Sequence, residues 1–267
     1  MTSLISLDNS QIEYRFSDKN HCETLLFLHG LGANLSQFDE QYIFFKDIYN
    51  VLLVNLRGHG NSKVAEPSNA CDYQLSKIAE DVTALVNILG IKKVHLVGNS
   101  MGGNIGFEIL NSHGYLLSSL TTFGTTVKLK ASCWHILTLR LLYKLIPKAC
   151  IAEISSCTGR THLSRQKIKK MMLCAQKLTL QLVLPNISEF DYCSVIRNSK
   201  IPILVIKAEK DKSINKAINS TVEEIENKKN VQLICMKDVG HFANLDKPHH
   251  FNNMLRAFIA SKSRISK

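Results

Sequence analysis

The sequence predicts an α/β fold in which a doubly wound, mostly parallel sheet carries a helical insertion. Short β-branched or leucine-rich runs that end in glycine or polar residues alternate with helical patterns along most of the chain. This alternation stops between Val127 and Lys200, where helical patterns follow one another. Strands that alternate with helices form parallel sheets, and the chemistry of such sheets lies beyond the carboxyl ends of the strands.

Length and composition set the class of protein. A chain of 267 residues with 45% apolar content can bury the core of one large domain with an insertion. Residues 1–17 lack a basic start followed by an apolar run, so no secretory signal is expected. No uncharged stretch approaches the length of a membrane span. We therefore expect a cytoplasmic protein.

The cysteines indicate neither a disulfide framework nor a metal site. They form no C-x-x-C pair and have no histidine partner at zinc spacing; their positions are 22, 71, 133, 150, 157, 174, 193 and 235. Reduced and mostly buried thiols are expected instead.

Six runs are predicted to be buried strands: 24–30, 50–58, 92–100, 118–125, 201–211 and 231–241. Helices are predicted at 75–90, closed by Gly90, at about 101–112 and at 251–262. Polar residues gather where the predicted strands end: His29, Arg57, Ser100, Asp211 and His241. Because the carboxyl ends of parallel strands meet at one edge of a sheet, this is the expected place of the site.

The insertion is helical and strongly basic. Helical patterns cover 134–146 and 164–184, and residues 127–200 hold 13 Lys and Arg against 3 Asp and Glu, a net charge of +10 of the total +11. We interpret residues 1–126 and 201–267 as the core domain and residues 127–200 as a helical cap over the carboxyl edge of the sheet.

Ser100 lies in the pattern Gly98-x-Ser100-x-Gly102, directly after a predicted strand and directly before a predicted helix. This is the pattern of a nucleophile elbow, a turn so sharp that the flanking positions must lack side chains while the serine oxygen projects from the sheet edge. The alternative is a glycine-containing strand-to-helix turn that only packs well. The surrounding strands and helices favour the elbow.

A serine hydroxyl needs a base to activate it and an acid to orient that base. His241 follows the last predicted strand and Asp211 ends the strand before it, which gives the chain order Ser, Asp, His that is typical of this elbow. Ten histidines are present, so the position of His241, not its residue type, selects it. Glu209 and Asp238 are the rival acids.

The oxyanion formed by attack on a carbonyl needs hydrogen-bond donors. The backbone N–H of Met101, at the N-terminus of the predicted helix, should be one of them. The second should come from the loop after the first predicted parallel strand, where Leu31 is the expected donor.

Five motifs, in order along the chain, resemble landmarks of the α/β-hydrolase superfamily, and specifically of its small cap-bearing esterase and enol-lactonase-like branch. They are LHGLGAN (28–34), LRGHGNS (56–62), VGNSMGG (97–103), IPILVIKAEKD (201–211) and VGHFANLDKP (239–248). The resemblance implies an α/β-hydrolase fold with Ser100 as nucleophile, His241 as base, Asp211 as its partner, and Leu31 and Met101 as oxyanion donors. It also implies a cap over the pocket and no metal or organic cofactor.

The chain departs from the family pattern in a few places. Asn55 and Ala208 replace the aspartate and glycine often found there, and neither position is catalytic in the expected mechanism. A serine nucleophile argues against epoxide hydrolase and haloalkane dehalogenase chemistry. Phe242 stands where carbon–carbon bond hydrolases commonly have tryptophan. His59 is interpreted as a loop residue near the pocket, not as a second base.

The resulting hypothesis is a serine hydrolase that cleaves a carboxylic ester, lactone or thioester of small-molecule size through an acyl-enzyme. A carbon–carbon bond hydrolase of the meta-cleavage type and a non-catalytic ligand-binding member of the fold are the alternatives.

No nucleic-acid-binding motif is present, so no nucleic-acid partner is expected. The basic cap is either a solvated face or a peripheral contact with an anionic membrane. Four cap residues either line the pocket or pack between helices: Trp134, Leu137, Leu141 and Met171.

Overall fold

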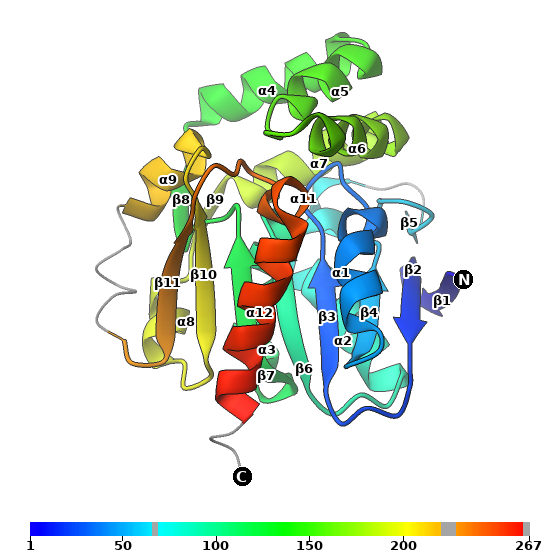
Figure 1. The fold of residues 1–267 in the computed structure, drawn as a ribbon. Coiled ribbons are helices and arrows are strands. Elements are labelled where there is room, and N and C mark those ends of the chain that lie inside the picture. The colour runs from blue at the N-terminus through cyan, green and yellow to red at the C-terminus, as the bar shows by residue number, and fades with distance from the viewer. Residues whose placement is uncertain (66–68, 220–227, 264–267) are drawn as a thin grey trace.

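A computed structural model describes residues 1–65, 69–219 and 228–263. Its main sheet has the strand order β1-β2-β4-β3-β6-β7-β10-β11, with β5 paired to β2 (Figure 1). The strands are β1 (Ser3–Leu7), β2 (Ser10–Ser17), β3 (Thr24–Leu28), β4 (Asn50–Val54), β5 (Lys63–Val64), β6 (Val94–Asn99), β7 (Leu117–Phe123), β10 (Ile203–Ala208) and β11 (Val231–Met236). The six predicted strands are β3, β4, β6, β7, β10 and β11, and each pairs in parallel with its neighbours in this set. The doubly wound, mostly parallel sheet is therefore confirmed.

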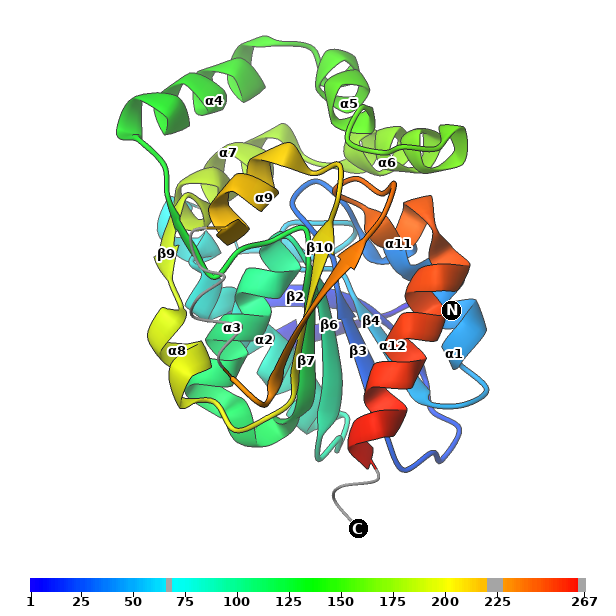
Figure 2. The same ribbon diagram turned by 60° about the vertical axis from the view of Figure 1, so that its left-hand side comes forward.

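Helices cover both faces of this sheet (Figures 1 and 2). The strands alternate between two apolar cores: Leu26 and Leu28 of β3 join one, and Leu25 and Phe27 join the other. The first core is closed by α2 (Leu75–Ile88), α3 (Met101–His113) and α8 (Cys193–Asn198). The second is closed by α1 (Asp39–Phe45) and α12 (Pro248–Ser263). Because successive side chains of a strand point to opposite faces, a strand between two helical layers must be apolar throughout.

The segment between β7 and β10 lies over the carboxyl ends of the strands (Figures 1 and 2). It contains β8 (Lys128–Lys130), α4 (Cys133–Leu145), α5 (Lys148–Ser156), α6 (His162–Cys174), α7 (Lys177–Val183), the 3-10 turn η4 (Leu184–Ile187) and β9 (Glu189–Asp191), which pairs antiparallel with β8. The predicted helical pattern 164–184 is interrupted by the extended backbone of Ala175 and Gln176. Helix α8 comes before residue 200 but packs beside α3 on the sheet. The division of the chain into core and cap at residues 127 and 200 stays a prediction.

The expectation of mostly buried cysteines is wrong. All eight thiols are free, and only Cys193 is buried. The expectation came from the residue type, whereas exposure is decided by position, and most of these cysteines lie on outward-facing loops or helix surfaces.

None of the helices described in the structure is both long and apolar enough to cross a bilayer.

Candidate active site

Ser100 occupies a strained turn between β6, which ends at Asn99, and α3, which begins at Met101. Its backbone has φ 52° and ψ −118°, a region that side-chain-bearing residues rarely adopt. A Cβ on Gly98 would lie 2.3 Å from the carbonyl oxygen of Gly102, and a Cβ on Gly102 would lie 2.1 Å from that of Leu28. The glycines at both positions therefore allow helix α3 to approach the strand ends closely enough to expose the serine.

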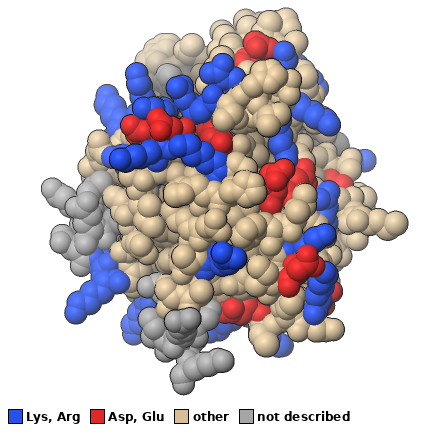
Figure 3. All heavy atoms as spheres, viewed as in Figure 1, with Lys and Arg blue, Asp and Glu red and all other residues tan. Residues whose placement is uncertain are grey.

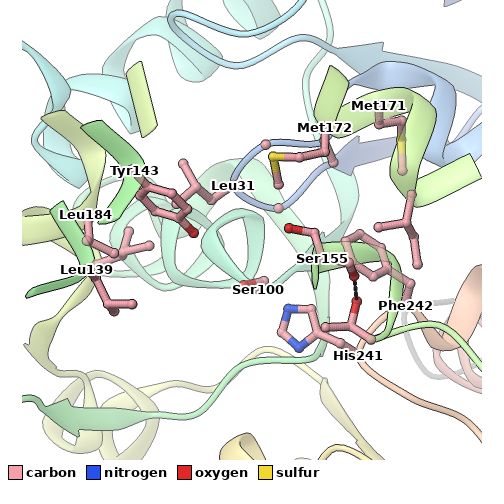
Figure 4. A pocket seen from close by; sticks show the side chains of 16 residues that line it. Leu31, Ser100, Leu139, Tyr143, Ser155, Met171, Met172, Leu184, His241 and Phe242 are labelled. Carbon is pink, nitrogen blue, oxygen red and sulfur yellow. Dashed lines mark hydrogen bonds between the residues drawn. The ribbon is translucent and has the colours of Figure 1, made fainter. Parts of the chain in front are cut away.

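His241 and Asp211 are brought together from the loops after β11 and β10. The Asp211 Oδ2 lies 2.6 Å from His241 Nδ1, and the Asp211 carboxylate is buried. Nδ1 can donate only when it carries the proton, so this contact leaves Nε2 as the lone-pair nitrogen of the neutral ring. Figure 4 shows the imidazole next to Ser100, and both residues line one cavity.

The two rival acids lie elsewhere. Glu209 is exposed, accepts a hydrogen bond from the Asp238 backbone N–H at 2.8 Å and pairs with Lys210 at 3.1 Å. Asp238 is also exposed and lies 3.8 Å from Lys210 and 3.7 Å from Lys247. Of the three carboxylates, Asp211 is the one that meets His241.

Two buried histidines hold the loop that follows β3. His59 Nε2 accepts a hydrogen bond from the Gly32 N–H at 3.2 Å, and His29 Nε2 accepts one from the Leu56 N–H at 3.0 Å. Their rings lie 5.0 Å apart. Burial lowers the pKa of His59 to about 4, and burial together with the nearby His59 holds the pKa of His29 well below its ordinary value. His59 is thus a neutral positioning residue whose lone pair is already used, which fits its interpretation as a loop residue.

Hydrogen bonding within this loop singles out the Leu31 amide. The Gly30 N–H faces Gln37 Oε1 at 3.4 Å, the Gly32 N–H donates to His59, and the Ala33 N–H donates to the Gly30 carbonyl at 3.1 Å. The Leu31 amide is therefore the one that the described loop contacts leave for a substrate. On the other side, Met101 is the first residue of α3, and the first amides of a helix have no carbonyl one turn earlier to bond.

Two polar residues at the site were missed by sequence reasoning. The Nδ2 of Asn99, beside the serine, donates to the carbonyls of His241 at 3.1 Å and Phe123 at 3.2 Å. Asp246 accepts hydrogen bonds from the Gly240 N–H at 2.7 Å and, between α5 and α6, from the Arg160 N–H at 2.7 Å. Asn99 connects the His241 loop to the Ser100 turn, and Asp246 connects it to the segment between α5 and α6. Asn99 lies in the motif VGNSMGG and Asp246 in the motif VGHFANLDKP. Their position within these motifs was the sequence signal that could have identified them.

Arg57, also predicted at a strand end, does not line the cavity. Its guanidinium contacts Asp81 through Nε at 2.7 Å and Nη2 at 2.8 Å, and both side chains are buried. Arg57 therefore fastens the loop after β4 to helix α2.

The cavity above Ser100 has a volume of about 410 Å³ and is largely apolar. Its walls come from the core loops and from the segment above them: Leu31, Ala33, Leu139, Tyr143, Ile168, Met171, Met172, Leu184, Ile187 and Phe242, with the hydroxyls of Ser155 and Thr158 (Figure 4). No Lys, Arg, Asp or Glu is among the described residues that line it. Nor do the described residues contain a group of three or more side chains suited to hold a metal ion.

Of the four cap residues considered from sequence, Met171 lines the cavity. Trp134, Leu137 and Leu141 neither line it nor pack between helices, because all three are exposed. Both interpretations are therefore wrong for these three residues. Helix α4 is apolar on two sides, and its inward side supplies Leu139 and Tyr143 instead.

Comparisons with known proteins agree with this architecture. A family model described as the alpha/beta hydrolase fold matches residues 23–141. The 3-oxoadipate enol-lactonase 2 of Acinetobacter baylyi is 23% identical over 253 residues, covering 87% of each chain. A 2-hydroxy-6-oxononadienedioate/2-hydroxy-6-oxononatrienedioate hydrolase of Paraburkholderia phymatum is 26% identical over 259 residues, covering 89% of this chain and 87% of that protein. A thermophilic esterase structure from Thermogutta terrifontis superimposes with a TM-score of 0.83 at 22% identity, covering 98% of this chain and 99% of that one.

A mostly parallel sheet with a serine elbow at its carboxyl edge defines a protein with the α/β-hydrolase fold. Residues 23–141 match the family model of that fold, and the superposition with the esterase extends the same α/β-hydrolase fold over nearly the whole chain. The resemblance to esterases and enol-lactonases of this fold, expected from the five motifs, is confirmed by these matches.

Proposed function

We propose that this protein is a serine hydrolase that cleaves a carboxylic ester of small-molecule size through an acyl-enzyme. The observation that carries the proposal is the convergence of three groups from three loops: a strained serine facing an apolar cavity, an imidazole in the same cavity, and a buried carboxylate 2.6 Å from the imidazole Nδ1. A buried carboxylate there fixes the ring orientation and stabilises the imidazolium that forms during attack.

The reaction follows from these positions. The Ser100 Oγ attacks the ester carbonyl carbon while its proton passes to His241 Nε2, and Asp211 stabilises the imidazolium through Nδ1–H. The amides of Leu31 and Met101 donate to the oxyanion. Collapse of this intermediate expels the alcohol, which takes the proton from His241. Water, deprotonated by His241, then attacks the acyl-enzyme and releases the carboxylic acid and free Ser100.

We further propose that the acyl group is neutral and apolar. The relatives named above for 3-oxoadipate and for oxonona-dienedioate and -trienedioate act on substrates that carry carboxylates by name. A carboxylate in this cavity would meet thioether, alkyl and aromatic groups with no described cationic side chain to pair with. Burying an unpaired charge is costly, so a neutral acyl group is favoured.

The nucleophile is tested with a fluorophosphonate probe and a short activated ester, p-nitrophenyl butyrate. Ser100→Ala should abolish labelling and lower turnover by about three or more orders of magnitude, because the attacking oxygen is lost without adding bulk to the elbow. Ser155→Ala is the matched control, since this second hydroxyl lies in the same cavity, and it should keep labelling and most of the activity. Labelling that persists in Ser100→Ala but disappears in Ser155→Ala would contradict the assignment. A wild-type protein that neither reacts with the probe nor hydrolyses esters would favour a ligand-binding member of the fold.

A further inference from the structure

Helix α4 has an apolar side that faces away from the molecule. Five large apolar residues of this helix have exposed fractions between 41% and 82%: Trp134, Leu137, Leu141, Leu142 and Leu145. Four of them recur at intervals of three and four residues (134, 137, 141 and 145), which places them along one stripe of the helix. Apolar residues gathered in this way on a surface mark a contact with a partner. We name these five residues the outer α4 stripe.

The opposite side of the same helix already has its contact. Leu139 and Tyr143 line the cavity above Ser100, and α4 packs on α7. Helix α4 is thus apolar on both sides while only one side is covered. Figures 1 and 2 show α4, α5 and α6 as the outermost layer of the molecule, farthest from the sheet.

The surroundings of the stripe are basic. Residues 133–183, which form α4 to α7, contain nine Lys and Arg but only one acidic residue, Glu153. Figure 3 shows blue side chains around the tan surface of this upper region. Arg140 and Lys144 belong to α4 itself, and the helical period puts them together on one flank of the outer α4 stripe. Two lysines of α6 are engaged elsewhere: Lys167 with Asp39 at 3.2 Å and Lys169 with Glu153 at 2.5 Å.

We propose that the outer α4 stripe binds the surface of an anionic lipid bilayer, with Arg140 and Lys144 at the headgroups. An amphipathic helix with apolar residues on one face and basic residues beside them is suited to lie in the membrane interface. Anionic headgroups complement the positive charge of the cap. A second copy of this chain would instead bring two basic surfaces against each other, which like-charge repulsion opposes. Because Leu139 and Tyr143 are on the same helix, one wall of the cavity would then lie at the bilayer surface.

The fluorescence of Trp134 can report membrane binding, because Trp134 is the only tryptophan in the sequence and is 82% exposed. Its emission should shift to shorter wavelength when the protein is titrated with vesicles of phosphatidylcholine and phosphatidylglycerol. Vesicles of phosphatidylcholine alone should bind at least about ten-fold more weakly, and salt should weaken anionic binding through screening. Membrane binding is independent of the proposed hydrolysis, and the titrations use Ser100→Ala protein so that no lipid can be cleaved.

Three variants, all of which retain Trp134, test separately the apolar residues of the outer α4 stripe, the basic residues beside it and an exposed apolar residue elsewhere. Replacing Leu137, Leu141 and Leu145 by Gln should weaken binding at least about ten-fold by removing the inserted apolar area. Replacing Arg140 and Lys144 by Gln should weaken anionic binding by about five-fold per residue without affecting binding to neutral vesicles. Ile88→Gln, which changes an exposed apolar residue at the end of α2, should bind as the parent does.

Several results would overturn membrane binding. The first is an unchanged Trp134 emission with both kinds of vesicle. The second is equal binding to neutral and anionic vesicles. The third is a concentration-dependent blue shift without lipid, together with a dimer mass in light scattering, which would assign the stripe to contact between two copies. Vesicle binding that survives the triple Leu variant would show that another surface is responsible.

Discussion

Asp211 affords the sharpest test at the scale of single residues, because its buried carboxylate meets His241 while the nearby carboxylates do not. In Asp211→Asn the amide would no longer hold the imidazole in the tautomer that leaves Nε2 ready to accept a proton. We expect kcat to fall by about three to four orders of magnitude with little change in KM. Steady-state kinetics on p-nitrophenyl butyrate measure both constants.

The same assay on two matched variants checks which carboxylate matters. Glu209→Gln and Asp238→Asn change exposed side chains that pair with Lys210, so each should stay within a few-fold of the parent. A crippled Glu209→Gln or Asp238→Asn beside an active Asp211→Asn would assign the acid differently.

Asn55 shows how a departure from the family pattern is accommodated. Its Oδ1 accepts a hydrogen bond from the Leu35 N–H at 2.6 Å, and its Nδ2 donates to Glu13. Burial alone would raise the pKa of Glu13, but hydrogen bonds from Asn61 and Asn55 hold it below its ordinary value. An aspartate at position 55 would place a second carboxylate against Glu13 and remove this donor. The asparagine is therefore the residue that suits this neighbour.

At the scale of secondary-structure elements, the parallel strands were predictable, and the contacts of the segment between β7 and β10 were less so. A strand buried on both faces is expected to be apolar throughout, and β3 and β4 are visible as continuous apolar runs of this kind, with β10 nearly so. Helix α4 is apolar on two sides, and periodicity cannot say which side is covered. For that reason the sequence did not single out Leu139 and Tyr143, which line the cavity. It offered Trp134, Leu137 and Leu141 as candidates for the pocket or for helix packing, and all three are exposed.

Buried polar residues of the site were also beyond sequence reasoning. Asn99, Gln37 and Asn244 are fully buried, and the Gln37 Nε2 lies 3.0 Å from the Asn99 Oδ1. In the sequence a buried amide looks the same as one on the surface, because its burial depends on partners more than 60 residues away. Ser100, Asp211 and His241 were identifiable since a chemical requirement, and not only a packing pattern, selects them; their catalytic roles stay predictions.

The apolar side chains that α4 and α6 contribute to the cavity predict a preference for neutral acyl groups. With the same leaving group and a similar acyl length, kcat/KM for p-nitrophenyl butyrate should exceed that for mono-p-nitrophenyl succinate by at least about 100-fold, because the succinyl carboxylate would be buried without a partner. Leu139→Lys, on the cavity side of α4, should narrow this ratio. Leu137→Lys, on the outer side of the same helix, is the matched control and should not. Comparable kcat/KM values for the two esters in the parent protein would contradict a neutral substrate.

At the scale of the whole molecule, buried polar groups join parts that are distant in the chain. Asp246 accepts hydrogen bonds from the Gly240 N–H and, at 2.6 Å, from the Ser164 hydroxyl of α6. His29 and His59 likewise join the loop after β3 to the loop after β4, and each uses its Nε2 lone pair as an acceptor. Protonation of either imidazole would remove that acceptor and place a charge in a buried site. The fold therefore stabilises the neutral form of both histidines.

This pair predicts how global stability depends on pH. Unfolded His59 takes up a proton near pH 6.5, whereas in the folded protein its pKa is about 4. Between these values the unfolded state binds more protons, so the free energy of unfolding is at its full value above about pH 6.5 and decreases as the pH falls toward 4. His59 alone should contribute a slope of about 1.4 kcal/mol per pH unit between pH 6 and 5, and the lowered pKa of His29 adds a slope of the same sign. Urea unfolding at several pH values measures this slope.

Two variants test the assignment to His59. His59→Gln should be less stable than the parent at pH 7, and its free energy of unfolding should depend less on pH, because the uptake of about one proton on unfolding is lost. His250→Gln changes an exposed histidine of α12 and should keep the parent slope. An unchanged slope in His59→Gln would mean that this histidine is not held neutral by the fold.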